Sequence, residues 1–242
     1  QEASFVSGWA LLGTIGFLAL YWLRKRLVLL PGGAIRYWLH LHLVVASISL
    51  FAYAAHTGYA LPKGKFEMLL ALVFFLTWLS GACGSLLSYM WPKRLRRRTP
   101  EVLFEDISMY RQGLKLQVEQ LVEKHVRESG SDLISKLYMS SLESYFDRPR
   151  NFMAHMIGNR STEGRLLQRV VGIERYLDSS SKAYAANLQE CIARKASLDY
   201  HWSLQLSLKS WLIVHVMLTS ILITFGVAHL FVVYAYFGRG GP

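Results

Sequence analysis

The sequence predicts an all-α protein: an integral membrane four-helix bundle with an inner-side helical soluble insert between spans three and four. Three observations lead to this prediction. Of the 242 residues, 52% are hydrophobic, which is a high fraction for a soluble domain. The apolar residues are concentrated in four long runs. The basic residues gather at particular ends of these runs, as they do in membrane proteins.

Each of the four apolar runs is long enough to cross a bilayer, because a helix needs about 20 residues to span about 30 Å of hydrocarbon. The first and third runs contain no charged residue, and the second and fourth are interrupted only by histidines. A basic cluster follows the first run instead of preceding it, so we expect a retained anchor rather than a cleaved signal peptide. The four predicted spans cover residues 4–23, 37–61, 68–91 and 210–238.

The net charge of +11 indicates membrane topology rather than a nucleic-acid surface. Residues 99–205 carry 14 basic and 14 acidic side chains, so the whole excess lies outside them. Basic residues cluster at 24–26 and 36, between the first two spans, and at 93–98, after the third. Because loops on the cytoplasmic side are rich in Lys and Arg, both termini are expected outside and the 92–209 region in the cytoplasm. We therefore expect a protein of the plasma (inner) membrane, in contact with lipid and not with nucleic acid.

This topology divides the chain into three parts. Transmembrane helices occupy 1–97, a cytoplasmic helical insert occupies 98–205, and the fourth span with an outer tail occupies 206–242. In the insert, Pro100 suits the start of a first helix, and Gly130 is expected to end it.

The rest of the insert is also predicted to be mainly helical. A second short helix covers 132–145, and 147–160 is expected to be a loop because it contains Pro and Gly. Ser161 or Thr162 then caps a longer helix. From about Lys182 onward no Pro or Gly breaks the pattern until deep inside the fourth span, so one helix is expected to continue into that span.

Four histidines form two pairs of equal spacing inside the second and fourth spans. His42 and His56 are fourteen residues apart, and so are His215 and His229. Fourteen residues are nearly four helical turns, so the second histidine returns to within about 40° of the first, about 21 Å along the axis. His40 is sixteen residues from His56, a rotation of about 160°, and is not expected to share this face. Ionisable residues inside a membrane span are costly, which makes the four histidines functional candidates.

The histidines also match in depth. His42 lies six residues after Arg36, and His215 lies six residues after Lys209. Both spans are predicted to run from inside to outside. His42 is therefore expected to meet His215 at an inner level, while the other two histidines meet at an outer level.

Two imidazoles at each of two levels are typical of haem ligation. Two neutral imidazoles fill both axial positions of a haem iron, which suits electron transfer rather than oxygen chemistry. Zinc or copper is less well matched, since no cysteine or carboxylate lies beside either pair. Covalent haem attachment is excluded because no CxxCH motif is present. The predicted cofactors are two haem b groups with bis-histidine iron.

A haem-free function remains an alternative for the same residues. A membrane histidine can also be a packing residue or part of a proton relay, in a transporter or an assembly scaffold. A transporter is expected to have repeats, broken spans or acidic residues at mid-membrane, and the four spans contain no Asp or Glu. An assembly scaffold would not require the two histidines of each pair to lie at the same depth in the membrane. The histidines of the insert show no such spacing and are expected to be structural or solvated: His125, His155 and His201.

With these residues identified, the chain resembles the bis-histidine di-haem membrane cytochromes b. These are the four-helix haem core of cytochrome b in bc complexes and the cytochrome b subunits of membrane hydrogenases and formate dehydrogenases. The resemblance covers about 1–97 and 206–238. It rests on the two His-x13-His spacings, on His56-Thr57-Gly58 and on the small residues of 80–84. The long insert has no counterpart in the usual short loop of that family.

The resemblance implies an electron-transfer subunit of a larger oxidoreductase complex, not catalytic by itself. Other redox subunits are the implied partners, and a quinone is an implied donor or acceptor, although no residue set specifies a quinone site. Arg36 and Lys209 match basic residues that pair with haem propionates, and equally match positive-inside anchors. Gly58, Gly81 and Gly84 are candidate cofactor contacts, because small residues leave room for a flat macrocycle; the alternative is close helix packing.

Overall fold

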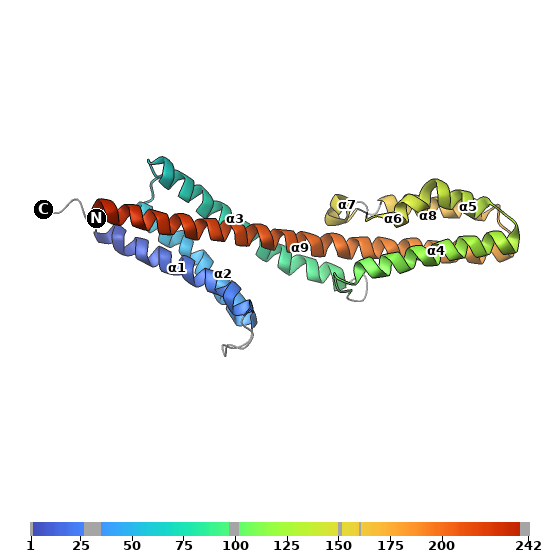
Figure 1. Ribbon diagram of the computed structural model, residues 1–242, viewed down its shortest axis with the longest axis horizontal. Coiled ribbons are helices and arrows are strands. Elements are labelled where there is room, and N and C mark those ends of the chain that lie inside the picture. The colour runs from blue at the N-terminus through green and yellow to red at the C-terminus, as the bar shows by residue number, and fades with distance from the viewer. Residues whose placement is uncertain (1, 27–34, 97–101, 150–151, 160, 238–242) are drawn as a thin grey trace. The chain divides into compact units, whose positions relative to one another are not determined.

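The computed structural model describes residues 2–26, 35–96, 102–149, 152–159 and 161–237, which form helices and short connections (Figure 1). No strand occurs in these ranges. The prediction of an all-α protein is therefore confirmed.

Within the described ranges, three helices are long and apolar enough to cross a membrane. They are α2 (Ile35–Thr57), α3 (Lys65–Arg96) and α9 (Ser179–Phe237). In α1 (Glu2–Arg26) the described apolar stretch, Phe5–Tyr21, is shorter. The membrane character of the chain is supported to this extent, while the fourth span and the orientation stay predictions.

The chain divides into two compact units. Unit 1 comprises Gln1–Ser85 and Trp211–Pro242, and unit 2 comprises Leu86–Ser210. Helices α3 and α9 each contribute residues to both units. The unbroken α9 confirms the prediction that one helix continues from about Lys182 into the last apolar run.

Unit 2 begins at Leu86, whereas the insert is predicted to begin at residue 98. The reason is that α3 continues beyond the apolar run, and Trp91 near its end is buried in unit 2. There the Trp91 side chain belongs to a small core with Tyr200 and Leu204 of α9. The helix start expected at Pro100 lies outside the described residues.

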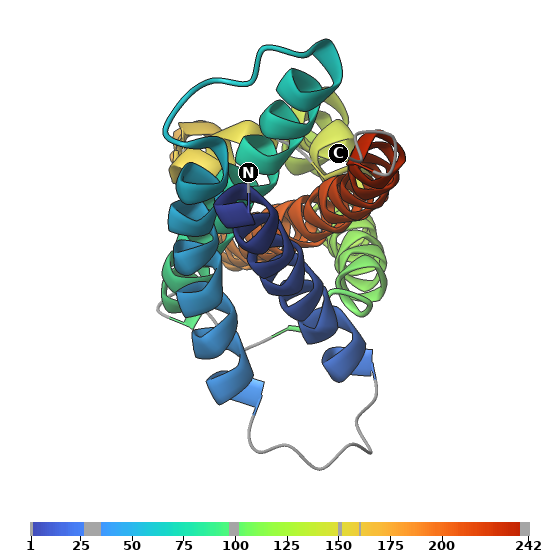
Figure 2. The ribbon, with the colours of Figure 1, turned by 90° about the vertical axis from the view of Figure 1, so that its left-hand side faces the viewer.

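The helices of unit 1 share one core. Leu11 of α1, Phe74 of α3 and Leu222 of α9 belong to it, and Tyr53 of α2 packs against it. The Tyr53 ring stacks on Phe74 with ring centroids 4.7 Å apart. Helices α1 and α2 lie side by side (Figure 2).

The outer faces of these helices are apolar as well. Large side chains such as Phe51 of α2, Leu79 of α3 and Phe231 of α9 are exposed. Apolar surface of this extent is uncommon on soluble monomers, and it is what contact with lipid requires.

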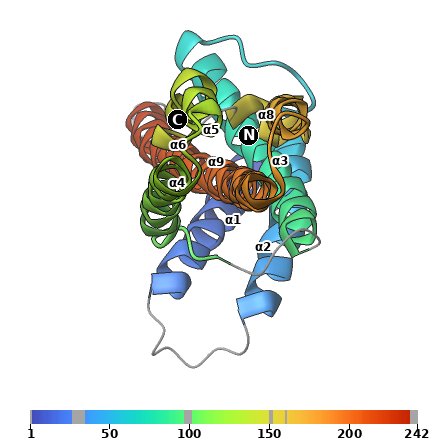
Figure 3. The ribbon, with the colours of Figure 1, turned by 90° about the vertical axis from the view of Figure 1, so that its right-hand side faces the viewer.

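Unit 2 has its own core, built by helices packed along the first part of α9 (Figure 3). In α4 (Ile107–Ser129), Leu114, Val118 and Val122 recur every four residues and form the buried stripe. The other elements are short: α5 (Leu133–Leu137), the π-helical η1 (Tyr138–Leu142), α6 (Glu143–Asp147), α7 (Phe152–Ile157) and α8 (Ser161–Glu174).

Two local predictions have different outcomes. Gly130 ends α4 with φ 65°, so the expected helix end is confirmed. The loop expected over 147–160 is wrong in part, because it contains α7. The Phe152 ring meets Trp202 of α9 edge to face at 6.0 Å, and His155 is buried. Tertiary packing therefore stabilises a helix that the local sequence does not indicate.

Candidate functional site

The outer histidine pair comes together between α2 and α9. The ring centroids of His56 and His229 are 6.5 Å apart, and the ring planes are at 87°. Phe66, near the start of α3, stacks on His229 with its centroid 6.3 Å away. The matched depth predicted for these two histidines therefore corresponds to a close approach of their side chains.

The inner pair lies on the same two helices. His42 and His215 lie close enough for their charges to interact. The His42 ring packs against Tyr21 of α1, with ring centroids 5.0 Å apart. The His215 ring stacks on Trp211, one helical turn earlier, with ring centroids 5.5 Å apart and planes at 21°.

His40 takes no part in either pair. It lies on the exposed side of α2, where its Nδ1 donates a hydrogen bond to the Arg36 carbonyl at 2.6 Å. This placement agrees with the rotation that separates His40 from the face of His42 and His56.

Serine side chains from the flanking helices reach one histidine of each pair. The Oγ atom of Ser80 on α3 lies 2.7 Å from Nδ1 of His215. The Oγ atom of Ser7 on α1 lies 3.4 Å from Nδ1 of His56. In both contacts the ring nitrogen beside the serine hydroxyl is Nδ1.

In the other histidine of each pair, no serine contacts Nδ1 among the described residues. Nδ1 of His42 and Nδ1 of His229 are buried and have no hydrogen-bond partner among the described residues. A buried polar atom that makes no hydrogen bond is costly and calls for an explanation. Because either ring nitrogen of a neutral histidine can bind a metal, a metal-containing cofactor fits these atoms.

Glycines of the site make close contacts that a side chain would disturb. A Cβ atom added to Gly81 would lie 3.3 Å from Cε1 of His215, and one added to Gly8 would lie 3.0 Å from Cε1 of His56. A Cβ atom at Gly84 would fall 1.6 Å from Cζ2 of Trp211. The space beside Gly84 thus holds the Trp211 indole, which favours the packing interpretation of this glycine.

Gly58 lies in the turn that follows α2. Its φ of 61° is in the left-handed region, and its amide donates to the Ala55 carbonyl at 3.4 Å. No atom lies within 4 Å of the position that a Cβ would take. The conformation of the turn is therefore sufficient reason for glycine here.

The two predicted propionate partners both have contacts within the protein. Arg36 is exposed, and its Nη2 donates to the Tyr37 hydroxyl at 3.1 Å. Lys209 Nζ lies 2.7 Å from a carboxylate oxygen of Glu105 and 3.9 Å from the centroid of the Phe104 ring. The hydrogen bond from Lys209 holds the pKa of Glu105 below its usual value. Lys209 is thus already paired with a carboxylate of unit 2.

No contact of Ser7, Ser80 or Trp211 with a histidine was predicted from the sequence, although Ser80 belongs to the small residues of 80–84. A signal was available, because the dipeptide Ser-Gly occurs in the first run and again in the third. The role of these dipeptides could not be inferred from the sequence, because the sequence does not show that each of them lies beside a histidine of another helix.

The three histidines of unit 2 are buried rather than solvated. His125 is an example, since its Nε2 lies 2.8 Å from the Oγ of Ser181. Such contacts are typical of a structural role.

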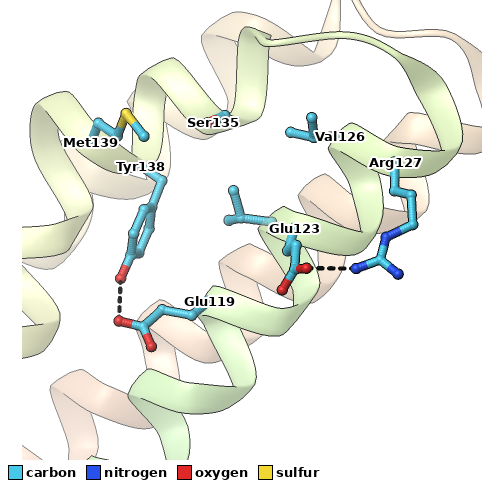
Figure 4. Close-up of a pocket in the computed structure, with 8 residues that line it drawn as sticks. Glu119, Glu123, Val126, Arg127, Ser135, Tyr138 and Met139 are labelled. Atoms are coloured by element: carbon cyan, nitrogen blue, oxygen red, sulfur yellow. Dashed lines mark hydrogen bonds and ion pairs between the residues drawn. The ribbon is translucent and has the colours of Figure 1, made fainter.

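A shallow pocket lies between α4 and the α5–η1 segment (Figure 4). Its polar side chains contact one another: the Tyr138 hydroxyl donates to Glu119 at 3.4 Å, and Arg127 donates to Glu123 at 2.5 Å. Burial, together with the charge of Glu119, raises the pKa of Tyr138 to about 12. The tyrosine is therefore neutral at physiological pH and is not an activated nucleophile.

No family model matches the chain, and neither a curated protein nor a solved structure is significantly similar to it. In the described part of the chain, no group of three or more His, Cys, Asp or Glu side chains is placed to hold a metal ion. A haem needs only two protein ligands, because the porphyrin supplies four nitrogens. The two histidine pairs are consequently the feature on which a functional conclusion depends.

Proposed function

We propose that the chain is a membrane electron-transfer subunit that holds two haem b groups. His42 and His215 would hold one haem, and His56 and His229 would hold the other. One observation carries the proposal: His56 and His229 approach each other between α2 and α9, and His42 and His215 of the same helices lie close enough for their charges to interact.

The separation of the outer pair fits ligation of one iron. Metal–imidazole nitrogen bonds are about 2.0–2.1 Å long, so two imidazoles on opposite sides of a metal ion have centroids about 6 Å apart. The centroids of His56 and His229 are 6.5 Å apart. The Nδ1 atoms of His42 and His229 have no hydrogen-bond partner among the described residues and are compatible with metal binding, a property that Nδ1 of His125 in unit 2 shares.

The residues of the site have defined tasks in this function. A bound haem supplies a reversible one-electron carrier. Two histidines per iron leave no open position for an exogenous ligand, which restricts the site to electron transfer. Phe66 and Trp211, which stack on His229 and His215, limit the access of water and fix the ring orientation.

The membrane arrangement is part of the proposal. Four spans place the N- and C-termini outside and the 92–209 region in the cytoplasm, as the positions of the basic residues favour. The pair His42–His215 and the pair His56–His229 then lie at different depths in the membrane. Electrons therefore cross the membrane between an inner and an outer redox partner. The neutral insert is a docking surface for another subunit, and a quinone is the donor or acceptor at one membrane face, as in the cytochromes b that the chain resembles.

The testing experiment is a reduced-minus-oxidised optical spectrum of the purified protein, together with haem quantification as the pyridine haemochrome. We expect two b haems per chain with a low-spin bis-histidine spectrum. One haem per chain means that one of the two pairs is wrong. A protein that contains no haem, although it was produced with ample haem supply, contradicts the proposal.

A haem-free proton relay is the second candidate, and one observation favours it. Glu67, at the start of α3, lies close enough to His229 for their charges to interact. A carboxylate beside two histidines is an arrangement that proton relays use. In this case the purified chain is colourless, and Glu67→Gln lowers proton flux in vesicles.

A further inference from the structure

We infer that two Ser-Gly dipeptides, Ser7-Gly8 of α1 and Ser80-Gly81 of α3, position one axial histidine of each haem. Ser80-Gly81 orients His215, and Ser7-Gly8 orients His56. This inference rests on the proposed function and deepens it, because it assigns the helices that hold the ligands but supply none.

The inner contact is the tighter one. Ser80 Oγ lies 2.7 Å from Nδ1 of His215, a normal hydrogen-bond length. The position of a Cβ on the next residue, Gly81, is 3.3 Å from Cε1 of the same ring. Nδ1 and Cε1 are adjacent ring atoms, so the dipeptide contacts one edge of the imidazole.

The outer contact repeats this pattern on another helix. Ser7 Oγ lies 3.4 Å from Nδ1 of His56. The position of a Cβ on Gly8 is 3.0 Å from Cε1 and 3.3 Å from Nδ1 of that ring. The same dipeptide thus contacts the same two ring atoms at both levels.

The two residues of the dipeptide have complementary roles. Glycine lets the helix backbone approach the ring more closely than a Cβ would allow, and this approach brings the preceding serine within reach of Nδ1. When Nδ1–H donates to the serine oxygen, the lone pair is on Nε2, which is then the atom that faces the iron. The contact therefore selects both the tautomer and the ring orientation.

The hydrogen bond also affects the bound iron. A hydrogen-bond acceptor at the second ring nitrogen makes the coordinating nitrogen more basic, which stabilises ferric over ferrous iron. Loss of such a partner typically weakens metal binding by about 10–100-fold. Ser80→Ala should therefore raise the midpoint potential of one haem and lower its affinity for the protein.

The test is a potentiometric titration of the full-length haem-loaded protein, with haem content and EPR spectra measured on the same samples. Ser80→Ala is compared with Ser80→Thr, which restores a hydroxyl. The matched control is Ser85→Ala on the same helix, because Ser85 is partly exposed and its Oγ donates to the Ala82 carbonyl at 2.8 Å instead of to a histidine. A second pair compares Gly81→Ala with Gly13→Ala, since no atom lies within 4 Å of a Cβ at Gly13.

We expect Ser80→Ala to shift the potential of one haem upward and to alter its EPR signal while the other haem is unchanged. Ser80→Thr should return the potential toward the wild-type value, and Ser85→Ala and Gly13→Ala should shift neither haem. If Ser80→Ala retains both haems with wild-type potentials and EPR spectra, the positioning role is overturned and the haem function stands. If the wild-type protein holds no haem, the proposed function itself fails.

Discussion

The imidazole rings of His56 on α2 and His229 on α9 meet edge to face, with centroids 6.5 Å apart and ring planes at 87°. The two residues are far apart in the sequence, and each is preceded by another histidine fourteen residues earlier on its own helix. Those earlier histidines, His42 and His215, also interact. Two helices therefore meet through histidines at two levels, an arrangement that helix packing alone does not require.

The first prediction concerns the separation of the two haem sites. His56→Ala or His229→Ala should remove the outer haem and leave the inner one, because about 21 Å of helix lies between the levels. His42→Ala or His215→Ala should do the reverse. The measurements are the haem content of each variant and the splitting of the α-band in its reduced optical spectrum.

The control for these variants is His40→Ala. Nδ1 of His40 donates to the Arg36 carbonyl on the exposed side of α2, so this variant should retain both haems. Loss of a haem from His40→Ala, together with a harmless His42→Ala, would mean that the inner ligand has been misassigned.

The second prediction concerns the packing of α3 against α9 in unit 1. Gly84→Ala places a Cβ atom 1.6 Å from Cζ2 of Trp211, whose Nε1 donates to the Ser80 carbonyl at 2.8 Å. Because the indole must move, the free energy of unfolding should fall by about 1–3 kcal/mol. Thermal unfolding in detergent, followed by circular dichroism, measures this loss.

Gly13→Ala serves as the matched glycine substitution, because the surroundings of Gly13 are open. It should leave the unfolding temperature unchanged or raise it, since alanine is the better helix former. Equal destabilisation by the two substitutions would show that the contact with Trp211 is not the cause.

Much of the fold was predictable because it depends on local periodicity. The absence of Pro and Gly between Lys182 and Gly226 predicts one long helix, and α9 extends unbroken from Ser179 to Phe237. The equal spacing of the histidines likewise predicts which of them meet. Both inferences use only the 3.6-residue repeat and need no knowledge of tertiary contacts.

The remaining features depend on contacts between distant segments. The helix α7 forms in a segment that contains Pro and Gly, where Phe152 and His155 pack inward. Lys209 matches a propionate partner by position, yet its charge is paired with Glu105. Such pairings are set by the three-dimensional arrangement, and the order of residues along the chain does not reveal them.

The third prediction concerns a buried ion pair in unit 2. Lys195 and Asp199 are fully buried and hydrogen bonded to each other, and Lys195 Nζ also donates to the Arg148 carbonyl at 2.9 Å. Lys195→Met removes the cation that is hydrogen bonded to the buried Asp199, while Arg111 lies 3.9 Å from this carboxylate. The free energy of unfolding should fall by about 3–5 kcal/mol, measured by denaturant unfolding.

The neighbouring residue provides the comparison. Arg194 pairs with Glu190 at 2.6 Å with the same spacing along α9, but both side chains are exposed. Arg194→Met should therefore cost less than about 0.5 kcal/mol. If Arg194→Met and Lys195→Met lower the free energy of unfolding by similar amounts, burial is not the reason for the effect of Lys195→Met.

The fourth prediction concerns stability at alkaline pH. Burial and the neighbouring Glu119 raise the pKa of Tyr138 from 10.0 to about 12, so the folded state keeps this hydroxyl protonated after the unfolded state has lost the proton. Ionisation of Tyr138 therefore leaves folding stability unchanged below about pH 10 and lowers it between about pH 10 and 12. Tyr138→Phe should show a smaller loss of unfolding temperature over this interval, while the exposed Tyr176 provides the control as Tyr176→Phe. If Tyr138→Phe and the wild-type protein lose stability in parallel from pH 10 to 12, ionisation of Tyr138 is not coupled to folding.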